Sequence, residues 1–414
     1  MKTYDMHPVT SQERIAVIDV LRGVAIFGIL MVNVLYFFNP WYAPMTTADS
    51  TTGEHVVKFI TNTFFVSKFY TLFSFLFGLG MAIQMGRAQA KEAPFLPLYL
   101  RRLLVLAIFG VVHGVFLWTG DILLMYAVIG FLTVILFRNR SPKTLLVWAL
   151  VFLALPVLFI ALSAGLVELA RAAPPETGAF EQVQEAFAAA QEEIRQEVAA
   201  ATEAYRHGSW WTVTRYRASE FFSLVSSTML FMAPTVLGMF LLGLRAGKKG
   251  WFTNISANHA LFRRLLAWAL PIGLVLNLFV GATGFEQNKL GIDIFTLLEL
   301  AQVTALAVGS VLLSLSYIAG IVLLSRTATG ARLLTPLAPV GRMALTNYIA
   351  HSVVMSTLAY GYGVGMFSTT SLVTGFLLAI ALYAVQIPVS AWWLRRHRYG
   401  PLEWLWRRLT YGTV

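Results

Sequence analysis

The sequence has 414 residues, of which 57% are hydrophobic and only 12% are charged, and its formal net charge at pH 7 is +11. Soluble domains carry about 25% charged residues, so a deficit of this size along the whole chain predicts a polytopic membrane protein. The chain contains no cysteine, which excludes disulfides, thiolate zinc sites and thiol catalysis.

Ten apolar runs are long enough to span a bilayer, which needs about 20 residues for each crossing. The first run follows the polar segment MKTYDMHPVTSQER, is too long for a signal peptide and has no small-residue cleavage site, so we expect a retained span. The predicted fold is all-α, a polytopic integral membrane helix bundle of about ten transmembrane helices. The predicted spans are 16–38, 59–85, 100–118, 121–137, 144–166, 222–244, 261–281, 297–324, 337–360 and 371–393.

The positions of Lys and Arg predict the orientation of the bundle. An even number of spans places both termini on one side, and the loops on that side carry most of the positive charge. The short loops on the opposite side contain only Lys58 and Lys289. Because cytoplasmic loops collect Lys and Arg, both termini are predicted to be cytoplasmic. This bias accounts for the net charge without nucleic acid as a partner.

A long polar segment after the fifth span divides the chain into three parts. We expect a five-helix transmembrane half at 1–166, an extracytoplasmic loop at 167–217 and a second five-helix half at 218–414. Within the loop, apolar or aromatic positions recur at helical spacing and predict an amphipathic surface helix, which is either a lid or spacer packed on the bundle or a partner-binding module. These positions are Phe180, Val183, Phe187, Ile194 and Val198.

Polar side chains inside the first two spans are functional candidates, because a charged group within a bilayer is costly. In "VIDVLRGVAIFGILMVNV", Asp19 and Arg22 are three residues apart and share a helix face with Asn33. Two interpretations of Asp19 and Arg22 remain open: an ion pair that fixes the helix, and a site for an anionic ligand entering from the cytoplasm. Lys68 in the second span either extends to the outer interface or lies in a water-filled cavity.

The stretch "GVVHGVFLWTGDIL" places His113 in the outer half of the third span and Asp121 at the turn that follows. A neutral imidazole accepts and donates protons near pH 7, and a carboxylate orients it. This pair is therefore a candidate for proton transfer. The alternatives are a buried core histidine for His113 and a helix cap for Asp121.

The ninth span contains "GRMALTNYIAHSVV", in which Asn347 and His351 are four residues apart and lie on one helix face. With Arg342 at the cytoplasmic end, this helix also carries polar groups into the membrane. No motif of a soluble enzyme is present, and the histidines are too dispersed to predict a metal site. Besides a membrane enzyme, two classes of function stay open: a proton-coupled secondary transporter or exporter of a small molecule, and a scaffold for envelope assembly.

Three parts of the chain resemble the bacterial YeiB-like family, whose C-terminal half is known as domain of unknown function 418. They are "RIAVIDVLRGVAIFGILMVNV", "KFYTLFSFLFGLGMA" with "YLRRLLVLAIFGVVHGVFLWTGDILLMYAVIG", and "VGRMALTNYIAHSVV" with "YGPLEWLWRRLTYG". The resemblance covers nearly the whole chain. The Asp-x-x-Arg-Gly pattern at Asp19 and Arg22 is also similar to the start of heparan-alpha-glucosaminide N-acetyltransferase and, more distantly, of the integral-membrane acyltransferase 3 family. These groups form a transmembrane acyltransferase superfamily.

The resemblance implies an enzyme of the bacterial cytoplasmic (inner) membrane. Such an enzyme takes an acyl group, in the first place acetyl, from cytoplasmic acyl-CoA and attaches it to an extracytoplasmic sugar or envelope acceptor. Acyl-CoA is then a donor substrate, and no permanently bound cofactor or metal is expected. The expected partners are the lipid bilayer, acyl-CoA and the acceptor, and a homodimer is left open.

The superfamily chemistry assigns roles to the candidate residues. His113, oriented by Asp121, removes the acceptor proton or forms an acyl-imidazole, and Lys68 or Asn33 stabilises the oxyanion. By similarity to the heparan enzyme, His55 is an alternative catalytic histidine. The phosphates of acyl-CoA suit the arginines at the cytoplasmic ends of the predicted spans, where Arg245, Lys248 and Lys249 also lie. The residues expected to bind the donor are Asp19, Arg22, Arg101, Arg102, Arg342, Asn347 and His351.

Overall fold

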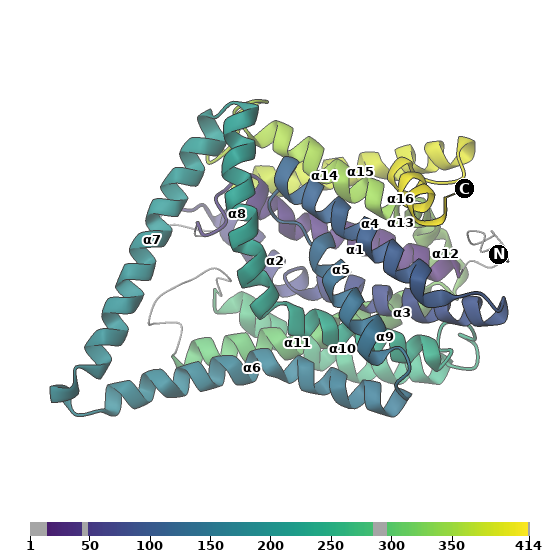
Figure 1. Cartoon of the computed structure of the whole chain (residues 1–414), viewed down its shortest axis with the longest axis horizontal. Coiled ribbons are helices and arrows are strands. Elements are labelled where there is room, and N and C mark those ends of the chain that lie inside the picture. Colours follow the sequence, from purple (N-terminus) through teal and green to yellow (C-terminus); the bar gives the residue numbers. More distant parts are fainter. Residues whose placement is uncertain (1–14, 44–48, 285–295, 413–414) are drawn as a thin grey trace.

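The structure, a computed structural model, describes residues 15–43, 49–284 and 296–412. All regular elements within these residues are helices, which confirms the predicted all-α bundle (Figure 1). Seven helical segments of the described chain are long and apolar enough to cross a membrane, so the protein is a multi-pass membrane protein. They are α1 (Ala16–Phe37), α2 (Thr52–Phe64) with α3 (Lys68–Ala90), α4 (Phe95–Phe116), α6 (Pro142–Ala172), α10 (His259–Ala282), α11 (Leu297–Leu324) and α15 (Leu372–Arg396).

The other three predicted spans are also helical, but each is short or interrupted. The span 121–137 is α5 (Leu123–Leu132), which continues into a π-helical turn, η1 (Thr133–Phe137). The span 222–244 is divided between α8 (Trp210–Phe231) and α9 (Ala233–Lys248). The span 337–360 consists of α13 (Ala338–Arg342) and α14 (Ala344–Ala359). A proline in the first turn of α9 suits its restart after α8, because proline is tolerated where helical N–H groups have no partner.

The second predicted span is two helices rather than one. Thr51 and Glu54 form a capping box that starts α2 well before the predicted boundary at residue 59. The chain then breaks before α3, where Ser67 adopts the left-handed conformation with a φ of 67°. Lys68 is consequently the first residue of α3 and not an interior residue of a continuous span.

The predicted surface helix is α7 (Ala179–His207), which follows a 3-10 turn, η2 (Pro175–Thr177). Figure 1 shows α7 at the edge of the molecule, joined to the bundle through α6 and α8. Its predicted apolar face is only partly buried, whereas Tyr205 near its end is 2% exposed. Tyr205 stacks on Tyr360 with ring centroids 4.7 Å apart and donates a hydrogen bond to Glu220. The C-terminal end of α7 is therefore its anchor to the bundle.

Helices from the two ends of the chain pack through glycines. A Cβ at Gly341 in α13 would overlap the carbonyl oxygen of Asp19 in α1, and a Cβ at Gly78 in α3 would overlap that of Phe240 in α9. Gly78 thus allows the close approach of α3 and α9. Each pair brings a helix from the N-terminal part of the chain against one from the C-terminal part, so a site between them uses residues from both.

Three short helical elements complete the C-terminal part of the described chain. They are α12 (Ala328–Leu334), a 3-10 turn η4 (Thr335–Leu337) that leads into α13, and α16 (Pro401–Tyr411) after α15. Figure 1 shows α16 at the C-terminal end of the chain, and α16 packs against α4 and α14. The polar N-terminal segment and Lys289 lie outside the described residues, and the side of the membrane that each end faces stays a prediction.

Candidate active site

A cavity of about 280 Å³ opens between α1, α3, α4, α13 and α16. Its walls combine apolar residues, among them Ile26, Ile29 and Leu106, with a group of basic residues. Two acidic residues, Asp19 and Glu403, accompany the positive charges. We call this space the basic cavity, because six cationic residues line it: Arg22, Arg87, Lys91, Arg102, Arg342 and Arg407.

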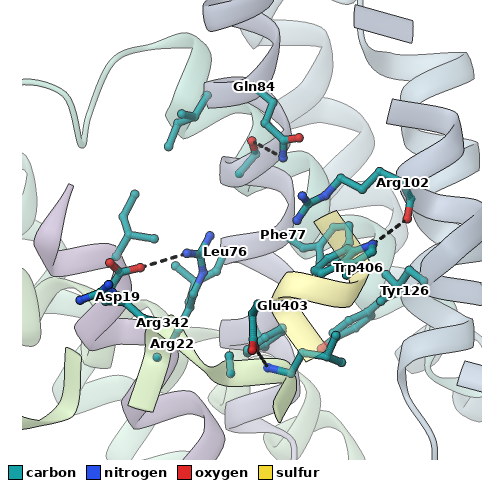
Figure 2. A pocket seen from close by; sticks show the side chains of 18 of the residues that line it. Asp19, Arg22, Leu76, Phe77, Gln84, Arg102, Tyr126, Arg342, Glu403 and Trp406 are labelled. Atoms are coloured by element: carbon teal, nitrogen blue, oxygen red, sulfur yellow. Dashed lines mark hydrogen bonds and ion pairs between the residues drawn. The ribbon is translucent and has the colours of Figure 1, made fainter. Parts of the chain in front are cut away.

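Asp19 and Arg22 lie on the α1 wall of the basic cavity. The Arg22 Nη1 atom donates a hydrogen bond to Asp19 Oδ1 at 3.1 Å, as the three-residue spacing on a helix allows. The ion pair of one interpretation is present, and both residues face a cavity, while the binding of an anionic ligand stays a prediction (Figure 2). The Arg22 side chain is 36% exposed, so this pair lies at the open part of the cavity.

Arg102 faces the same cavity from α4 and is held by α16. Its guanidinium carbon lies 3.9 Å from the centre of the Trp406 ring, and the Trp406 indole N–H donates to the Arg102 carbonyl oxygen at 3.1 Å. Figure 2 shows Arg102 and Trp406 across the cavity from Asp19 and Arg22. The neighbouring Arg101 is exposed and does not line the cavity. Stacking on an aromatic ring thus selects one of two adjacent arginines for this site.

Glu403 connects α16 to the start of α14. Its Oε1 atom accepts the backbone N–H of Leu345 at 2.7 Å and that of Thr346 at 3.1 Å, and its Oε2 atom accepts the Thr346 hydroxyl at 2.6 Å. A carboxylate at this place satisfies orphan N–H groups of the first helical turn. Burial raises the pKa of the Glu403 carboxyl above its usual value of 4.5, against the lowering effect of these hydrogen bonds. This contact gives the "GPLEW" segment a structural role.

A second cavity of about 120 Å³ adjoins the first. Asn33 and Asp121 line it, together with side chains of α3, α5 and α8. The two cavities share Ile29, Ile122 and Tyr348 as wall residues. A ligand that extends from the basic cavity along α1 therefore meets these three residues before it reaches Asp121. We call the second space the inner cavity.

His113 and Asp121 form a buried hydrogen-bonded pair beside the inner cavity. The His113 Nδ1 atom lies 2.8 Å from Asp121 Oδ1, and their side chains are 1% and 0% exposed. The second carboxylate oxygen, Oδ2, accepts the Leu124 backbone N–H at 2.8 Å at the start of α5. Asp121 thus caps the start of α5 and is a partner of His113 at once, and proton transfer by this pair stays a prediction.

A third residue, Ser352 of α14, completes the surroundings of the imidazole. The His113 Nε2 atom lies 2.7 Å from Ser352 Oγ, and Ser352 is 1% exposed. Tyr348, one turn earlier on α14, places its ring centroid 5.0 Å from that of His113. Sequence reasoning singled out Asn347 and His351 on this helix and missed Ser352. No local spacing signals a contact between residues 239 positions apart.

The remaining candidates for catalysis lie elsewhere. Lys68 is fully buried, and its Nζ atom donates to the Asn62 carbonyl oxygen at 2.6 Å, where it joins α2 to α3. His55 is exposed in the first turn of α2. Neither residue lines the basic or the inner cavity. Among the two proposed oxyanion-stabilising residues, only Asn33 faces a cavity with Asp121.

Asn347 and His351 face α15 rather than a cavity. The His351 Nε2 atom lies 2.8 Å from Gln386 Oε1, and Gln386 donates through Nε2 to the Asn347 carbonyl oxygen at 3.1 Å. The Asn347 amide donates to Ser390 Oγ at 3.0 Å. These contacts form a buried polar network between α14 and α15, which fixes the orientation of α14 around Tyr348 and Ser352.

The basic residues at the end of α9 also lie outside the basic cavity. Lys248 donates through Nζ to the Arg138 and Arg140 carbonyl oxygens at 2.6 and 2.8 Å, and Arg245 donates to the Pro142 carbonyl oxygen at 3.2 Å. These two side chains satisfy the backbone between η1 and α6. Three basic residues that line the cavity were not singled out as candidates from the sequence: Arg87, Lys91 and Arg407.

The chain matches one family model and is similar to bacterial proteins along nearly its whole length. The family described as "Protein of unknown function (DUF418)" matches residues 246–413. The chain is 33% identical to the "Uncharacterized protein YxaH" of Bacillus subtilis (strain 168), over 98% of this chain and 96% of that protein. It is 29% identical to the "Uncharacterized protein YeiB" of Escherichia coli (strain K12), over 96% of each chain.

Proposed function

The chain belongs to the YeiB-like DUF418 family, and we propose that it is a membrane acyltransferase. In this proposal acyl-CoA binds in the basic cavity, and its acyl group, in the first place acetyl, passes to a hydroxyl or amine in the inner cavity. The acceptor is an extracytoplasmic sugar or envelope component. The basic cavity lies at the end of the bundle that the distribution of Lys and Arg predicts to be cytoplasmic, and the bacterial homologues suit a cytoplasmic membrane location.

One observation carries the proposal: a strongly basic cavity and a second cavity share a wall beside the His113–Asp121 pair. Ile29, Ile122 and Tyr348 belong to both linings. A transfer reaction across a membrane needs donor and acceptor spaces that meet at one reacting point. Asp121 lines the inner cavity, and Tyr348 lines both cavities and contacts His113. The candidate base thus lies beside the meeting point.

The charge of the basic cavity suits the donor. CoA carries phosphate groups at one end and a neutral pantetheine arm with the thioester at the other. Guanidinium groups bind phosphates through paired hydrogen bonds, and six cations surround this cavity. The apolar residues Ile26 and Ile29 line the deeper part, towards the inner cavity, and suit the thinner and less polar arm.

His113 supplies the acid–base chemistry. An ionised Asp121 only accepts hydrogen bonds, so the proton between the two residues belongs to His113 Nδ1. The lone pair of Nε2, which meets Ser352 Oγ at 2.7 Å in this structure, is then the acceptor for the proton of the attacking group. As the C–S bond of the thioester breaks, the imidazolium returns this proton to the leaving thiolate. In this proposal Asn33, which lines the inner cavity, stabilises the developing oxyanion.

Binding of radiolabelled acetyl-CoA to the purified protein in nanodiscs tests the donor assignment. Competition with unlabelled CoA and with pantetheine, which lacks the phosphates, separates recognition of charge from recognition of the arm. We expect saturable binding that CoA displaces and that pantetheine displaces much less effectively. Absence of saturable binding for donors of every chain length would contradict the proposal. A proton-gradient-dependent flux of small molecules in proteoliposomes without a donor would then favour transport.

A further inference from the structure

The contact between His113 and Ser352 has the geometry of an activated serine. The His113 Nε2 atom lies 2.7 Å from Ser352 Oγ, and the other ring nitrogen lies 2.8 Å from Asp121 Oδ1. In a neutral imidazole whose Nδ1 proton faces Asp121, Nε2 has no proton and accepts the second bond. Ser352 is then the donor of the hydrogen bond to His113. This order of carboxylate, imidazole and hydroxyl is the one by which a histidine prepares a serine for nucleophilic attack.

The Ser352 hydroxyl bonds to His113 and not to the backbone of its own helix. Serine and threonine inside a helix commonly donate to a carbonyl oxygen of the preceding turn. Thr357 and Ser356, on the same helix, both donate to the Val353 carbonyl oxygen. Ser352 instead points across the interface between α14 and α4 and meets His113. Its orientation is thus set by the imidazole and not by its own helix.

Ser352 also lies close to the point where the two cavities meet. It follows Tyr348 by one helical turn, and Tyr348 lines both the basic and the inner cavity. The Tyr348 hydroxyl donates to the Gly120 carbonyl oxygen at 3.4 Å, a long bond beside Asp121. The Tyr348 ring therefore lies between the shared wall of the two cavities and the buried His113–Ser352 contact. In the proposal that follows, the Tyr348 side chain moves aside to admit the substrates to Ser352.

We propose that Ser352 is the nucleophile of the reaction and carries the acyl group as a covalent ester between two half-reactions. This inference rests on the proposed acyltransferase function. In the first half-reaction, Ser352 Oγ attacks the thioester carbonyl carbon while its proton moves to His113 Nε2. The C–S bond breaks, and the CoA thiolate leaves and takes that proton.

In the second half-reaction, the acceptor is the nucleophile and Ser352 is the leaving group. The acceptor hydroxyl or amine attacks the ester carbonyl and gives its proton to His113 Nε2. The bond between the acyl carbon and Ser352 Oγ breaks, and the serine oxygen takes the proton back. Each step balances without a further reactant. A covalent ester also explains how donor and acceptor use one reacting point from two cavities without meeting each other.

The decisive experiment traps the ester. The full-length protein in nanodiscs is mixed with radiolabelled acetyl-CoA without an acceptor, denatured, and examined for label on the chain, with mass spectrometry of the α14 peptide. We expect a burst of CoA release that approaches one equivalent per active protein and label on Ser352. The label should be absent from Ser352→Ala and His113→Ala and present in Ser356→Ala, the matched serine one turn later.

Ser352→Cys keeps the proposal testable if the alanine variant folds poorly. Cysteine preserves a nucleophile at this position, so the label should reappear as a thioester that neutral hydroxylamine removes readily. Wild-type transfer rates in a folded Ser352→Ala would overturn the serine assignment while leaving the acyltransferase function intact. Label on His113 in place of Ser352 would do the same. No CoA release from any donor by the wild type would remove the proposed function and this inference together.

Discussion

The Nδ1 atom of His113 and the Oδ1 atom of Asp121 lie 2.8 Å apart across the turn from α4 to α5, and both side chains are almost completely buried. The second carboxylate oxygen holds the first turn of α5 through the Leu124 N–H. Both oxygens of the Asp121 carboxylate are thus held in place, and Oδ1 in turn orients the His113 imidazole. An imidazole whose tautomer is set in this way presents its unprotonated Nε2 in one direction only.

Asp121→Asn should lower acyl transfer by about a hundredfold to ten-thousandfold, the range for loss of positioned acid–base catalysis. An amide retains the size of the carboxylate but loses the charge that stabilises the imidazolium. The measurement is the rate of CoA release in single turnover. A thermal melt of the same variant separates this loss from a weakened start of α5. Transfer at the wild-type rate in a folded Asp121→Asn would contradict the assigned role.

Arg102→Ala should raise the KM for acyl-CoA by about tenfold or more with little change in kcat, because a hydrogen bond to a charged group contributes about 1.5–3 kcal/mol. Arg101→Ala is the matched control, since the adjacent side chain is exposed and outside the cavity. Steady-state kinetics over a range of acetyl-CoA concentrations checks the pair. Equal changes of KM in the two variants would show that the phosphates of the donor do not bind at Arg102.

Gly341→Ala should destabilise the protein by about 1–3 kcal/mol, the range for overpacking. The added Cβ overlaps the Asp19 carbonyl oxygen and pushes α13 from α1, so the affinity for acyl-CoA should fall as well. Gly86→Ala on α3 is the control, because nothing lies within 4 Å of its added Cβ. Melting temperatures in detergent and donor binding measure both effects. A Gly341→Ala variant as stable as the control would show that the contact of α1 with α13 tolerates separation.

Glu403 predicts a pH dependence of stability. Burial raises the pKa of the Glu403 carboxyl above 4.5 in the folded protein. Between pH 4.5 and this raised pKa, the folded state therefore binds more protons than the unfolded state. The free energy of unfolding therefore falls as the pH rises from about 4.5 through the raised pKa. In Glu403→Gln this component disappears. Melting curves of both proteins across this range should converge in slope only above the raised pKa, and identical pH profiles throughout would contradict the assignment.

The sequence predicted the helical bundle well because composition and apolar run length act locally. All ten predicted spans are helical, and the amphipathic helix in the long loop exists as α7. The break at Ser67 was not predicted, since it depends on a left-handed residue that no glycine signals. The interruption between α8 and α9 likewise divides a run whose hydropathy reads as continuous.

The site was predictable only where its residues are neighbours in the sequence. His113 with Asp121 and Asp19 with Arg22 were found because eight and three residues separate the partners. Ser352 was missed because its contact joins α4 to α14 across the bundle. Selection of Arg102 over Arg101 also depends on a distant residue, Trp406, whose ring stacks on one of them.

The most direct test of the account compares wild type, His113→Ala and His55→Ala in proteoliposomes supplied with radiolabelled acetyl-CoA. A bacterial envelope extract provides the acceptors, and both CoA release and transfer of label to the extract are followed. The account predicts saturable transfer by the wild type, retention of that transfer in His55→Ala and its loss in a correctly folded His113→Ala. Full transfer by His113→Ala would contradict the central claim, and so would a wild type that releases no CoA.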